Sequence, residues 1–231
     1  LPPLTLFSFI KGDATRLNNW AKSLEDTPLT GSTSYFNFLA SHDGIGLRPT
    51  EGILNDEDRN IIADNVLANG GKINYKINPD GSKTPYELNI NFQDALITSN
   101  DSDEDRILKF IASQSILLCV VGMPGIYIHS LLGSRNDYEG VKKSGINRKI
   151  NREKLDLESL EKELSLNADR SKKLKQYLKL ISIRKVNSAF SPSASQNVII
   201  FDNRVFSIIR ESKTTKEKIL VLVNVSNDEV T

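Results

Sequence analysis

The sharpest chemical pattern in the chain is His42 followed by Asp43, directly after an apolar run at residues 34–41 (SYFNFLAS). This run is typical of a buried strand, and the carboxyl ends of parallel strands carry the active sites of α/β folds. Gly44 then lets the backbone approach a ligand closely. The pattern therefore indicates a ligand-binding or catalytic site. A strand-end turn in which Asp43 caps local amides explains the same residues equally well.

The other histidine, His129, lies in a second apolar run at residues 126–132 (IYIHSLL), which we expect to be a strand. A hydrogen-bonded core histidine is a more common role for such a residue than catalysis. The sequence has no cluster of His, Cys, Asp and Glu with metal-ligand spacing, and we expect no metal site. Gly44-Ile45-Gly46 alone is too short to predict a nucleotide-binding loop.

A basic segment at residues 147–154 (NRKINREK) has two readings, an exposed charged loop or a clamp for phosphate or sugar hydroxyls. No aromatic residues interrupt it, so nucleic acid is not an expected partner. The whole chain has 30 Lys and Arg against 29 Asp and Glu, a net charge of +1. The net charge therefore predicts no overall electrostatic attraction of the chain to nucleic acid or to an anionic membrane.

The elements that must position these residues follow a strand–helix–strand order, which predicts an α/β fold with a parallel sheet. Helices are expected from Asp13 with Leu17 and Trp20 on one face, from Asn55 or Asp56 to Gly70, over 103–122 and over 169–189. Residues 70–100 begin with a polar excursion that contains a Pro-Asp-Gly turn.

The pattern of apolar and polar residues changes after a Ser-Pro-Ser segment at residues 191–193. Three alternating or apolar runs, at residues 198–201, 205–211 and 219–225, predict the start of an antiparallel sheet. We therefore expect two parts: residues 1–190, which hold the parallel α/β elements, and residues 191–231.

Composition suits a globular protein, with 39% hydrophobic residues among 231. The single cysteine, Cys119, lies in an apolar stretch, which predicts a buried thiol and favours a reducing, cytoplasmic location. That stretch is interrupted by polar residues and falls short of the roughly 20 apolar residues of a membrane span. The only methionine is Met123 and the chain begins Leu1-Pro2-Pro3, so we expect a processed or truncated chain.

Five motifs occur in a specific order along nearly the whole chain. They are FLASHDGIG at 38–46, PYELN at 85–89, MPGIY at 123–127, LGSRND at 132–137 and RKINR at 148–152. This set resembles the carboxyl-terminal half of a sucrose phosphorylase-type enzyme of the α-amylase superfamily, glycoside hydrolase family 13. The resemblance implies the last part of an eight-stranded (β/α) TIM barrel followed by a small antiparallel β domain. Residues 34–41 and 126–132 would then be strands 7 and 8.

The resemblance implies a retaining double displacement, in which phosphate takes the glucosyl group and α-glucose 1-phosphate is formed. The family's nucleophilic Asp and acid/base Glu belong to strands that would precede residue 1. We therefore expect the chain to be inactive on its own. Asp43 matches the third family carboxylate, which stabilises the transition state.

By the same resemblance, His42 matches a ligand of the sugar hydroxyls and Arg148 an arginine that clamps glucose. Tyr86 matches a loop tyrosine near the phosphate or acceptor subsite. Glu87 stands where sucrose phosphorylases often have Gln, which makes it a further candidate substrate-binding residue.

The sequences around Arg48 (GIGLRP) and Arg135 (SRND) are closer to the branch that includes glucosylglycerate and sucrose 6-phosphate phosphorylases. Both arginines are candidate anion contacts, although surface arginines that only face water are equally common. The implied partners are an α-glucoside and phosphate, without a cofactor, and the full-length protein is a candidate homodimer. A hydrolase or transglucosidase of the same superfamily and a non-catalytic barrel that serves as a binding module are the alternatives.

Overall fold

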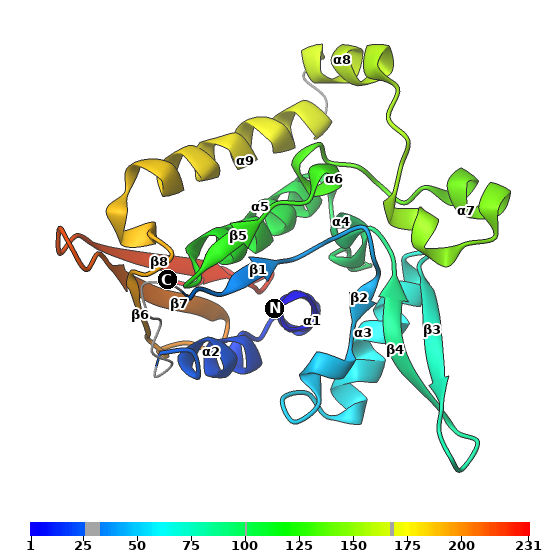
Figure 1. The fold of residues 1–231 in the computed structure, drawn as a ribbon, viewed down its shortest axis with the longest axis horizontal. Helices are drawn as coiled ribbons and strands as arrows, with labels where there is room; N and C mark the ends of the chain where they lie inside the picture. Colours follow the sequence, from blue (N-terminus) through cyan, green and yellow to red (C-terminus); the bar gives the residue numbers. More distant parts are fainter. Residues whose placement is uncertain (26–32, 100, 167–168) are drawn as a thin grey trace.

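Two short parallel strands, β1 (Phe36–Phe38) and β5 (Met123–Gly125), lie at the centre of the molecule (Figure 1). The computed structural model describes residues 1–25, 33–99, 101–166 and 169–231. In it, Asn37 of β1 is paired with Pro124 of β5. The parallel pairing of these two regions agrees with the predicted α/β class.

The prediction of a strand at residues 126–132 is wrong. β5 ends at Gly125, and helix α6 (Ile128–Leu131) follows, so His129 lies on a helix. A short apolar run without alternation fits a strand or a buried helix, and its composition does not separate the two. Glycine sets the position of the real strand. Gly122 has a φ of 111°, and a Cβ there would lie 2.7 Å from the backbone oxygen of Tyr35, beside β1.

Two long helices, α5 (Asp103–Cys119) and α9 (Asp169–Val186), pack against each other beside β1 and β5 (Figure 1). A capping box between Ser102 and Asp105 begins α5, which starts at the predicted residue, Asp103. Both helices end earlier than predicted, because the chain turns extended at residue 120 and a 3-10 turn, η3 (Ser188–Phe190), follows α9. In the described part of the chain, no helix is long and apolar enough to cross a membrane.

The amino-terminal region contains three helices, α1 (Pro2–Lys11), α2 (Thr15–Lys22) and α3 (Asp56–Ala68). The sequence pattern did not predict α1, which is buried on almost every side and therefore has no amphipathic period. In α2, Leu17 is fully buried as expected, although Trp20 is only partly covered. Helix α3 agrees closely with the prediction.

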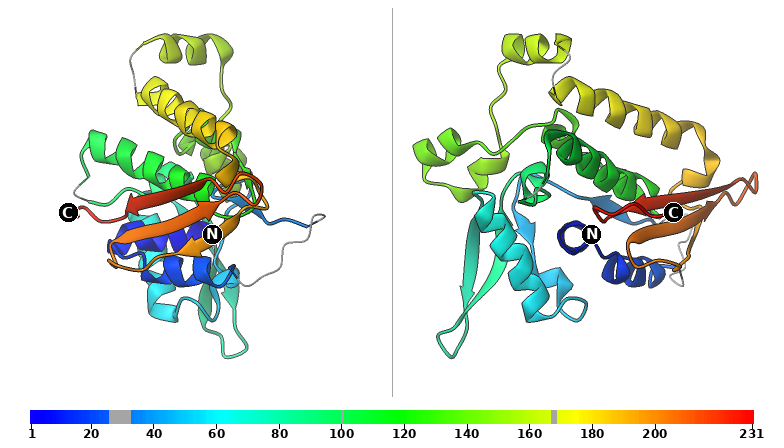
Figure 2. Two further views of the ribbon diagram at one scale, coloured as in Figure 1. Left: turned by 90° about the vertical axis from the view of Figure 1, so that its left-hand side faces the viewer. Right: turned by 180° about the vertical axis from the view of Figure 1, so that it is seen from behind.

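An antiparallel sheet of β2 (Ile45–Gly46), β4 (Lys83–Asn89) and β3 (Lys72–Ile77), in that order, forms the predicted polar excursion. Its β3–β4 hairpin extends from the body of the molecule (Figure 2) and turns at Gly81, which has a φ of 82°. Only the turn was expected. Because β2 follows the His42–Asp43 loop and pairs with β4, the hairpin carries its residues to that loop.

Residues 134–165, which include the basic segment at 147–154, form short helices joined by loops. These helices are α7 (Tyr138–Ser144), the 3-10 helix η2 (Asn147–Asn151) and α8 (Leu157–Ser165). Two further short elements, η1 (Arg48–Thr50) and α4 (Phe92–Ala95), flank the hairpin.

The carboxyl-terminal sheet consists of β6 (Ser195–Val198), β7 (Val205–Glu211) and β8 (Lys218–Asn224), all antiparallel. It packs against α2 and α5 (Figure 2). The predicted antiparallel sheet is confirmed, but its first strand begins earlier than the apolar run at 198–201 suggested. Residues 199–201 are substantially exposed and follow the strand instead.

Candidate functional site

The loop between β1 and β2 presents the Asp43 carboxylate to basic side chains from a distant part of the chain. Arg148 Nη1 lies 3.0 Å from Asp43 Oδ1, and Arg152 Nη2 lies 3.5 Å from the same oxygen. His42 Nε2 lies 3.6 Å from Asp43 Oδ2. The fold therefore brings together three of the residues that the sequence singled out, His42, Asp43 and Arg148.

Glu87 joins this group from β4. Arg148 donates from Nε to Glu87 Oε1 at 2.9 Å and approaches the same oxygen with Nη2 at 2.7 Å. Asn74 of β3 donates to the other carboxylate oxygen at 2.7 Å. Hydrogen bonding to Glu87 raises the pKa of Arg148 further above its ordinary value, so its guanidinium stays charged. Glu87 is only 5% exposed, and it serves chiefly as the anchor of Arg148.

Gly44 makes this arrangement possible by its lack of a side chain. A Cβ at this position would lie 2.6 Å from Glu87 Cγ and 2.7 Å from the backbone oxygen of Leu88. Both distances are far below van der Waals contact. The glycine was expected to admit a ligand, whereas the structure uses it to admit the Glu87 side chain.

The 3-10 helix η2 presents Arg148 because its neighbours are anchored. Ile150 is fully buried, and its carbonyl accepts a hydrogen bond from the backbone of Asp137 at 2.8 Å. Asn147 donates to Asn74 Oδ1 at 3.0 Å, which ties η2 to the hairpin. The basic segment is thus a structured part of the site.

Tyr86 and Arg48 lie near the carboxyl end of β2. Tyr86, on β4, is 37% exposed, and its carbonyl accepts from the backbone of Leu47 at 2.9 Å. Arg48 follows on η1 with an exposed side chain. The structure shows no hydrogen bond or ion pair between Arg48 and the Asp43 carboxylate, so the two belong to one region without direct contact.

Arg135 belongs to a separate cluster. Its Nε donates to Asp94 of α4, whose other oxygen accepts from the backbone of Asn136 at 2.6 Å. Burial raises the pKa of Asp94, and the charge of Arg135 opposes that rise. The Arg135 side chain is still 51% exposed, so part of its guanidinium faces solvent.

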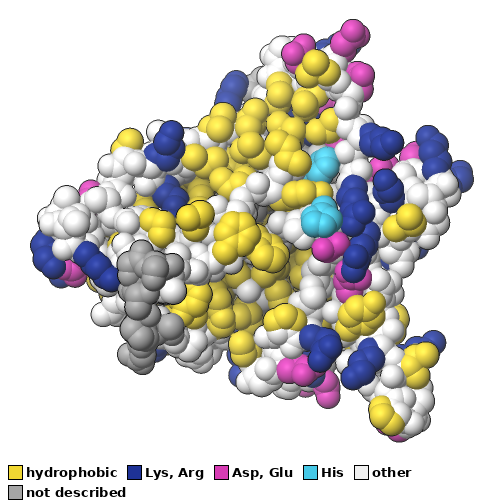
Figure 3. Space-filling view, viewed as in Figure 1, with side chains coloured by type: hydrophobic (Ala, Val, Ile, Leu, Met, Phe, Trp, Pro, Cys, Tyr) yellow, Lys and Arg dark blue, Asp and Glu magenta, His cyan; other side chains and the backbone are white. Residues whose placement is uncertain are grey.

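His129 is partly exposed and is not a core residue. Its Nδ1 lies 3.0 Å from Ser134 Oγ, and its ring packs edge-on against Tyr127 at a centroid distance of 5.1 Å. Burial lowers the pKa of this imidazole, which favours the neutral ring. Figure 3 shows both histidines of the chain on one face, beside a group of Lys and Arg side chains and a hydrophobic hollow.

Two residues that sequence reasoning did not single out also reach the loop, Asn151 and Arg152. Asn151 Nδ2 donates to the carbonyl of Asp43 at 2.8 Å, and Arg152 Nε donates to that of His42. Their only sequence signal was their place in the RKINR motif. Among the described residues, no group of three or more His, Cys, Asp or Glu could hold a metal ion. The arrangement offers one carboxylate, an imidazole and a charged guanidinium to a ligand rich in hydroxyl groups.

Comparison with known proteins shows extensive similarity to glycoside phosphorylases. The chain is 45% identical over 230 residues to the glucosylglycerate phosphorylase of Spirochaeta thermophila, covering 99% of this chain and 39% of that protein. It is 40% identical to the glucosylglycerate phosphorylase of Escherichia coli K12, covering 92% of this chain and 38% of that protein. The chain thus spans about two fifths of the length of these relatives. No protein-family model matches it.

A solved structure supports the fold. The crystal structure of sucrose 6F-phosphate phosphorylase from Thermoanaerobacter thermosaccharolyticum superposes with a TM-score of 0.78 at 22% identity. The match covers 97% of this chain and 42% of that chain.

Proposed function

Since the chain is homologous over nearly its whole length to the glucosylglycerate and sucrose phosphorylases, we propose that it forms the carboxyl-terminal part of a retaining α-glucosyl phosphorylase. The proposed reaction cleaves glucosylglycerate or a related α-glucoside with phosphate and releases α-glucose 1-phosphate. Phosphate is a substrate, and the reaction needs no cofactor.

The contact between Asp43 and Arg148 is the structural observation that supports this proposal best. A glycosyl transfer develops positive charge at the sugar carbon, and a nearby carboxylate stabilises that charge. We assign this role to Asp43. Arg148 Nη1, 3.0 Å from Asp43 Oδ1, holds the carboxylate in place and offers charged donors to the glucosyl hydroxyls. The His42 ring, whose Nε2 lies 3.6 Å from Asp43 Oδ2, is a further contact for these hydroxyls.

The second substrate subsite is assigned to the residues around the hairpin. Glycerate and phosphate are both anions, which arginine side chains bind well. Arg48 and the exposed part of Arg135 are therefore the proposed anion contacts. Tyr86 of β4, which is 37% exposed, is a further proposed contact. Glu87 shapes this subsite through the position in which it holds Arg148.

The central strands fit the seventh and eighth strands of a (β/α) barrel. Phe36 and Phe38 of β1 are 66% and 40% exposed, and Met123 of β5 is 52% exposed. Figure 3, which has the same view as Figure 1, shows hydrophobic side chains around a hollow in the region where Figure 1 places β1 and β5. In the proposal, further strands of the complete enzyme cover this surface and supply the nucleophilic Asp and the acid/base Glu. The 231 residues alone are then inactive.

The proposal is tested by incubating the complete protein that contains this chain with glucosylglycerate, sucrose and sucrose 6-phosphate, each with and without phosphate. We expect glucose 1-phosphate only when phosphate is present, and the fastest release from glucosylglycerate. Release of free glucose at the same rate without phosphate would identify a hydrolase. Binding of the glucosides without turnover would identify a non-catalytic module.

A further inference from the structure

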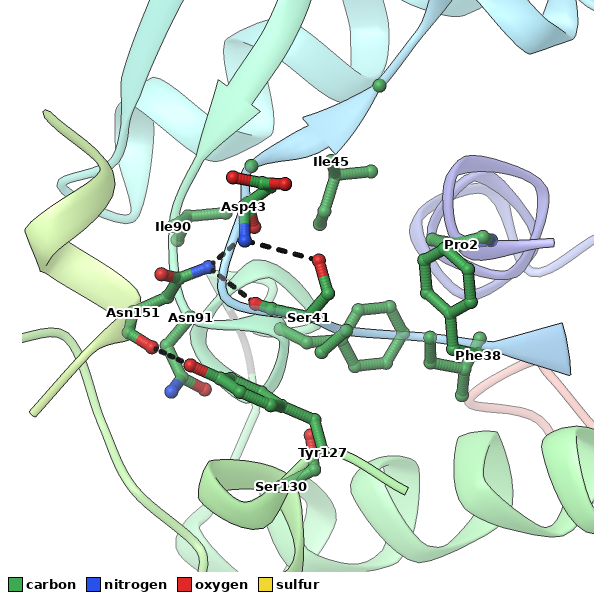
Figure 4. Close-up of a pocket in the computed structure, with 15 residues that line it drawn as sticks. Pro2, Phe38, Ser41, Asp43, Ile45, Ile90, Asn91, Tyr127, Ser130 and Asn151 are labelled. Atoms are coloured by element: carbon green, nitrogen blue, oxygen red, sulfur yellow. Dashed lines mark hydrogen bonds between the residues drawn. The ribbon is translucent and has the colours of Figure 1, made fainter. Parts of the chain in front are cut away.

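Three consecutive carbonyl groups of the catalytic loop are held by two neighbouring side chains. Asn151 Nδ2 donates to the carbonyl oxygens of Ser41 at 3.1 Å and Asp43 at 2.8 Å. Arg152 Nε donates to the carbonyl of His42, between them. Figure 4 shows the Asn151 amide pointing at the turn of the loop. Loop carbonyls of this kind lack strand partners and need donors from elsewhere.

We propose that Asn151, together with Arg152, is a positioning residue that fixes the Asp43 carboxylate for glucosyl transfer. The inference rests on the proposed function. Neither side chain needs to touch the substrate, because Asn151 acts through the backbone that carries Asp43, and Arg152 acts through that backbone and through its 3.5 Å contact with the Asp43 carboxylate. We call the hydrogen bonds from Asn151 and Arg152 to these three carbonyls the carbonyl clamp.

The backbone of Asp43 is held on both sides of its Cα atom. Its N–H donates to Ser41 Oγ at 3.2 Å, and its carbonyl accepts from Asn151 (Figure 4). With both peptide groups fixed, side-chain torsions are the main freedom left to the carboxylate. Arg148, at 3.0 Å, restricts these torsions.

Close packing does not hold this loop on its inner side. A cavity of about 40 Å³ is lined by Ser41, Asp43, Asn91, Tyr127 and Asn151, among others. It has room for one or two water molecules and leaves the loop without van der Waals support there. The hydrogen bonds of Asn151 therefore restrain the loop at this point, where close packing would restrain it elsewhere in a core.

Asn151 itself is rigidly placed. It is 5% exposed, it follows the fully buried Ile150, and its own carbonyl accepts from the Tyr127 hydroxyl at 2.9 Å. Of its side-chain amide, only Nδ2 forms hydrogen bonds. Its Oδ1 is buried and has no hydrogen-bond partner among the described residues. An amide nitrogen carries two hydrogens, one for each carbonyl. A carboxylate in its place would face two carbonyl oxygens without a donor.

The test compares Asn151→Ala and Asn151→Asp in the complete enzyme with a matched variant, Asn18→Ala. Asn18, on α2, is also fully buried, and its Nδ2 donates to a backbone carbonyl. The acceptor is Val205 of the carboxyl-terminal sheet, at 2.9 Å, away from the Asp43 loop. We expect both Asn151 variants to lower kcat by about 10- to 100-fold, because small displacements of catalytic groups have effects of this size. KM for the glucoside should change less than about 3-fold. Asn18→Ala should lower Tm and leave kcat within about 2-fold.

Hydrogen–deuterium exchange gives a readout that does not depend on activity. Exchange at residues 41–46 should rise in the Asn151 variants, and exchange at residues 205–211 should rise in Asn18→Ala. If the Asn151 variants do not fold, Arg152→Ala takes their place with the same expected exchange pattern. This variant removes the bond to the His42 carbonyl and the 3.5 Å contact between Arg152 Nη2 and Asp43 Oδ1.

The carbonyl clamp is refuted if exchange at 41–46 stays at the wild-type level. Its positioning role is refuted if exchange rises while kcat is unchanged, or if only KM rises. A wild-type enzyme without phosphorolysis would instead overturn the proposed function, and the exchange data would still decide whether the carbonyl clamp exists.

Discussion

Replacement of Arg210 by Met should destabilise the protein strongly, because this arginine joins the carboxyl-terminal sheet to helix α5. Arg210 is fully buried on β7 and donates to four backbone carbonyls. The acceptors are Cys119 at 2.6 Å, Ser191 at 2.9 Å, Ser195 at 3.1 Å and Ala194 at 3.2 Å. Among the described residues, no carboxylate forms an ion pair with it.

The expected magnitude follows from two opposing effects. Each hydrogen bond to a charged donor contributes about 1.5–3 kcal/mol, so four contribute about 6–12 kcal/mol. Burial of the guanidinium costs several kcal/mol, and the same burial lowers the pKa of Arg210 to about 10. Methionine removes both effects and nearly preserves the volume. We therefore expect a net loss of about 3–5 kcal/mol in the free energy of unfolding.

The loss is measured by urea denaturation and thermal melting of the complete protein, where it should lower Tm by about 3–5 °C. Arg204→Met is the matched control. Arg204 lies just before the same strand, but its partner, Asp202, is a surface carboxylate at 2.7 Å. Its Tm should stay near that of the wild type. Wild-type stability for Arg210→Met would show that the four hydrogen bonds, one to Cys119 of α5 and three to residues 191–195, do not stabilise the packing of the sheet.

Three further predictions concern the site and the core. Gly44→Ala should abolish most activity, because its Cβ would displace the Glu87 side chain. Gly46→Ala, whose Cβ would meet nothing closer than 3.8 Å, should stay active. Equal activities of the two variants would contradict this. Burial raises the pKa of Cys119 to about 12, so the folded protein should not react with a thiol reagent at pH 8, and rapid labelling would show that the thiol is accessible. Asp43→Asn in the complete enzyme should lower kcat by about 10²- to 10³-fold with little change in Tm, and an unchanged kcat would exclude a catalytic role.

The sequence allowed the prediction of elements with strong local signals. Helix α3 begins after Asn55, a residue suited to an N-cap, and ends shortly before Gly70, and strand β7 has a long apolar run, so both were expected near their actual positions. β5 could not be found in this way. It has three residues, one proline and one glycine, and it exists because β1 lies close enough to pair with it.

The candidate site shows the same limit. His42 and Asp43 were found because they end an apolar run, and Arg148 because it lies in a basic motif. The contact of Arg148 with Glu87 could not be predicted, since the two residues are 61 positions apart and the intervening chain forms several elements. Asn151 carries no charge and no unusual neighbours, so its part in the carbonyl clamp becomes visible only in three dimensions.

The central claim, retaining phosphorolysis of an α-glucoside, is tested most directly by the anomeric configuration of the product. The complete protein is incubated with glucosylglycerate and phosphate, and the first product is followed by proton and phosphorus NMR. Retention through two displacements predicts α-glucose 1-phosphate as the initial product. β-Glucose 1-phosphate, or free glucose with no phosphate ester, would contradict the account.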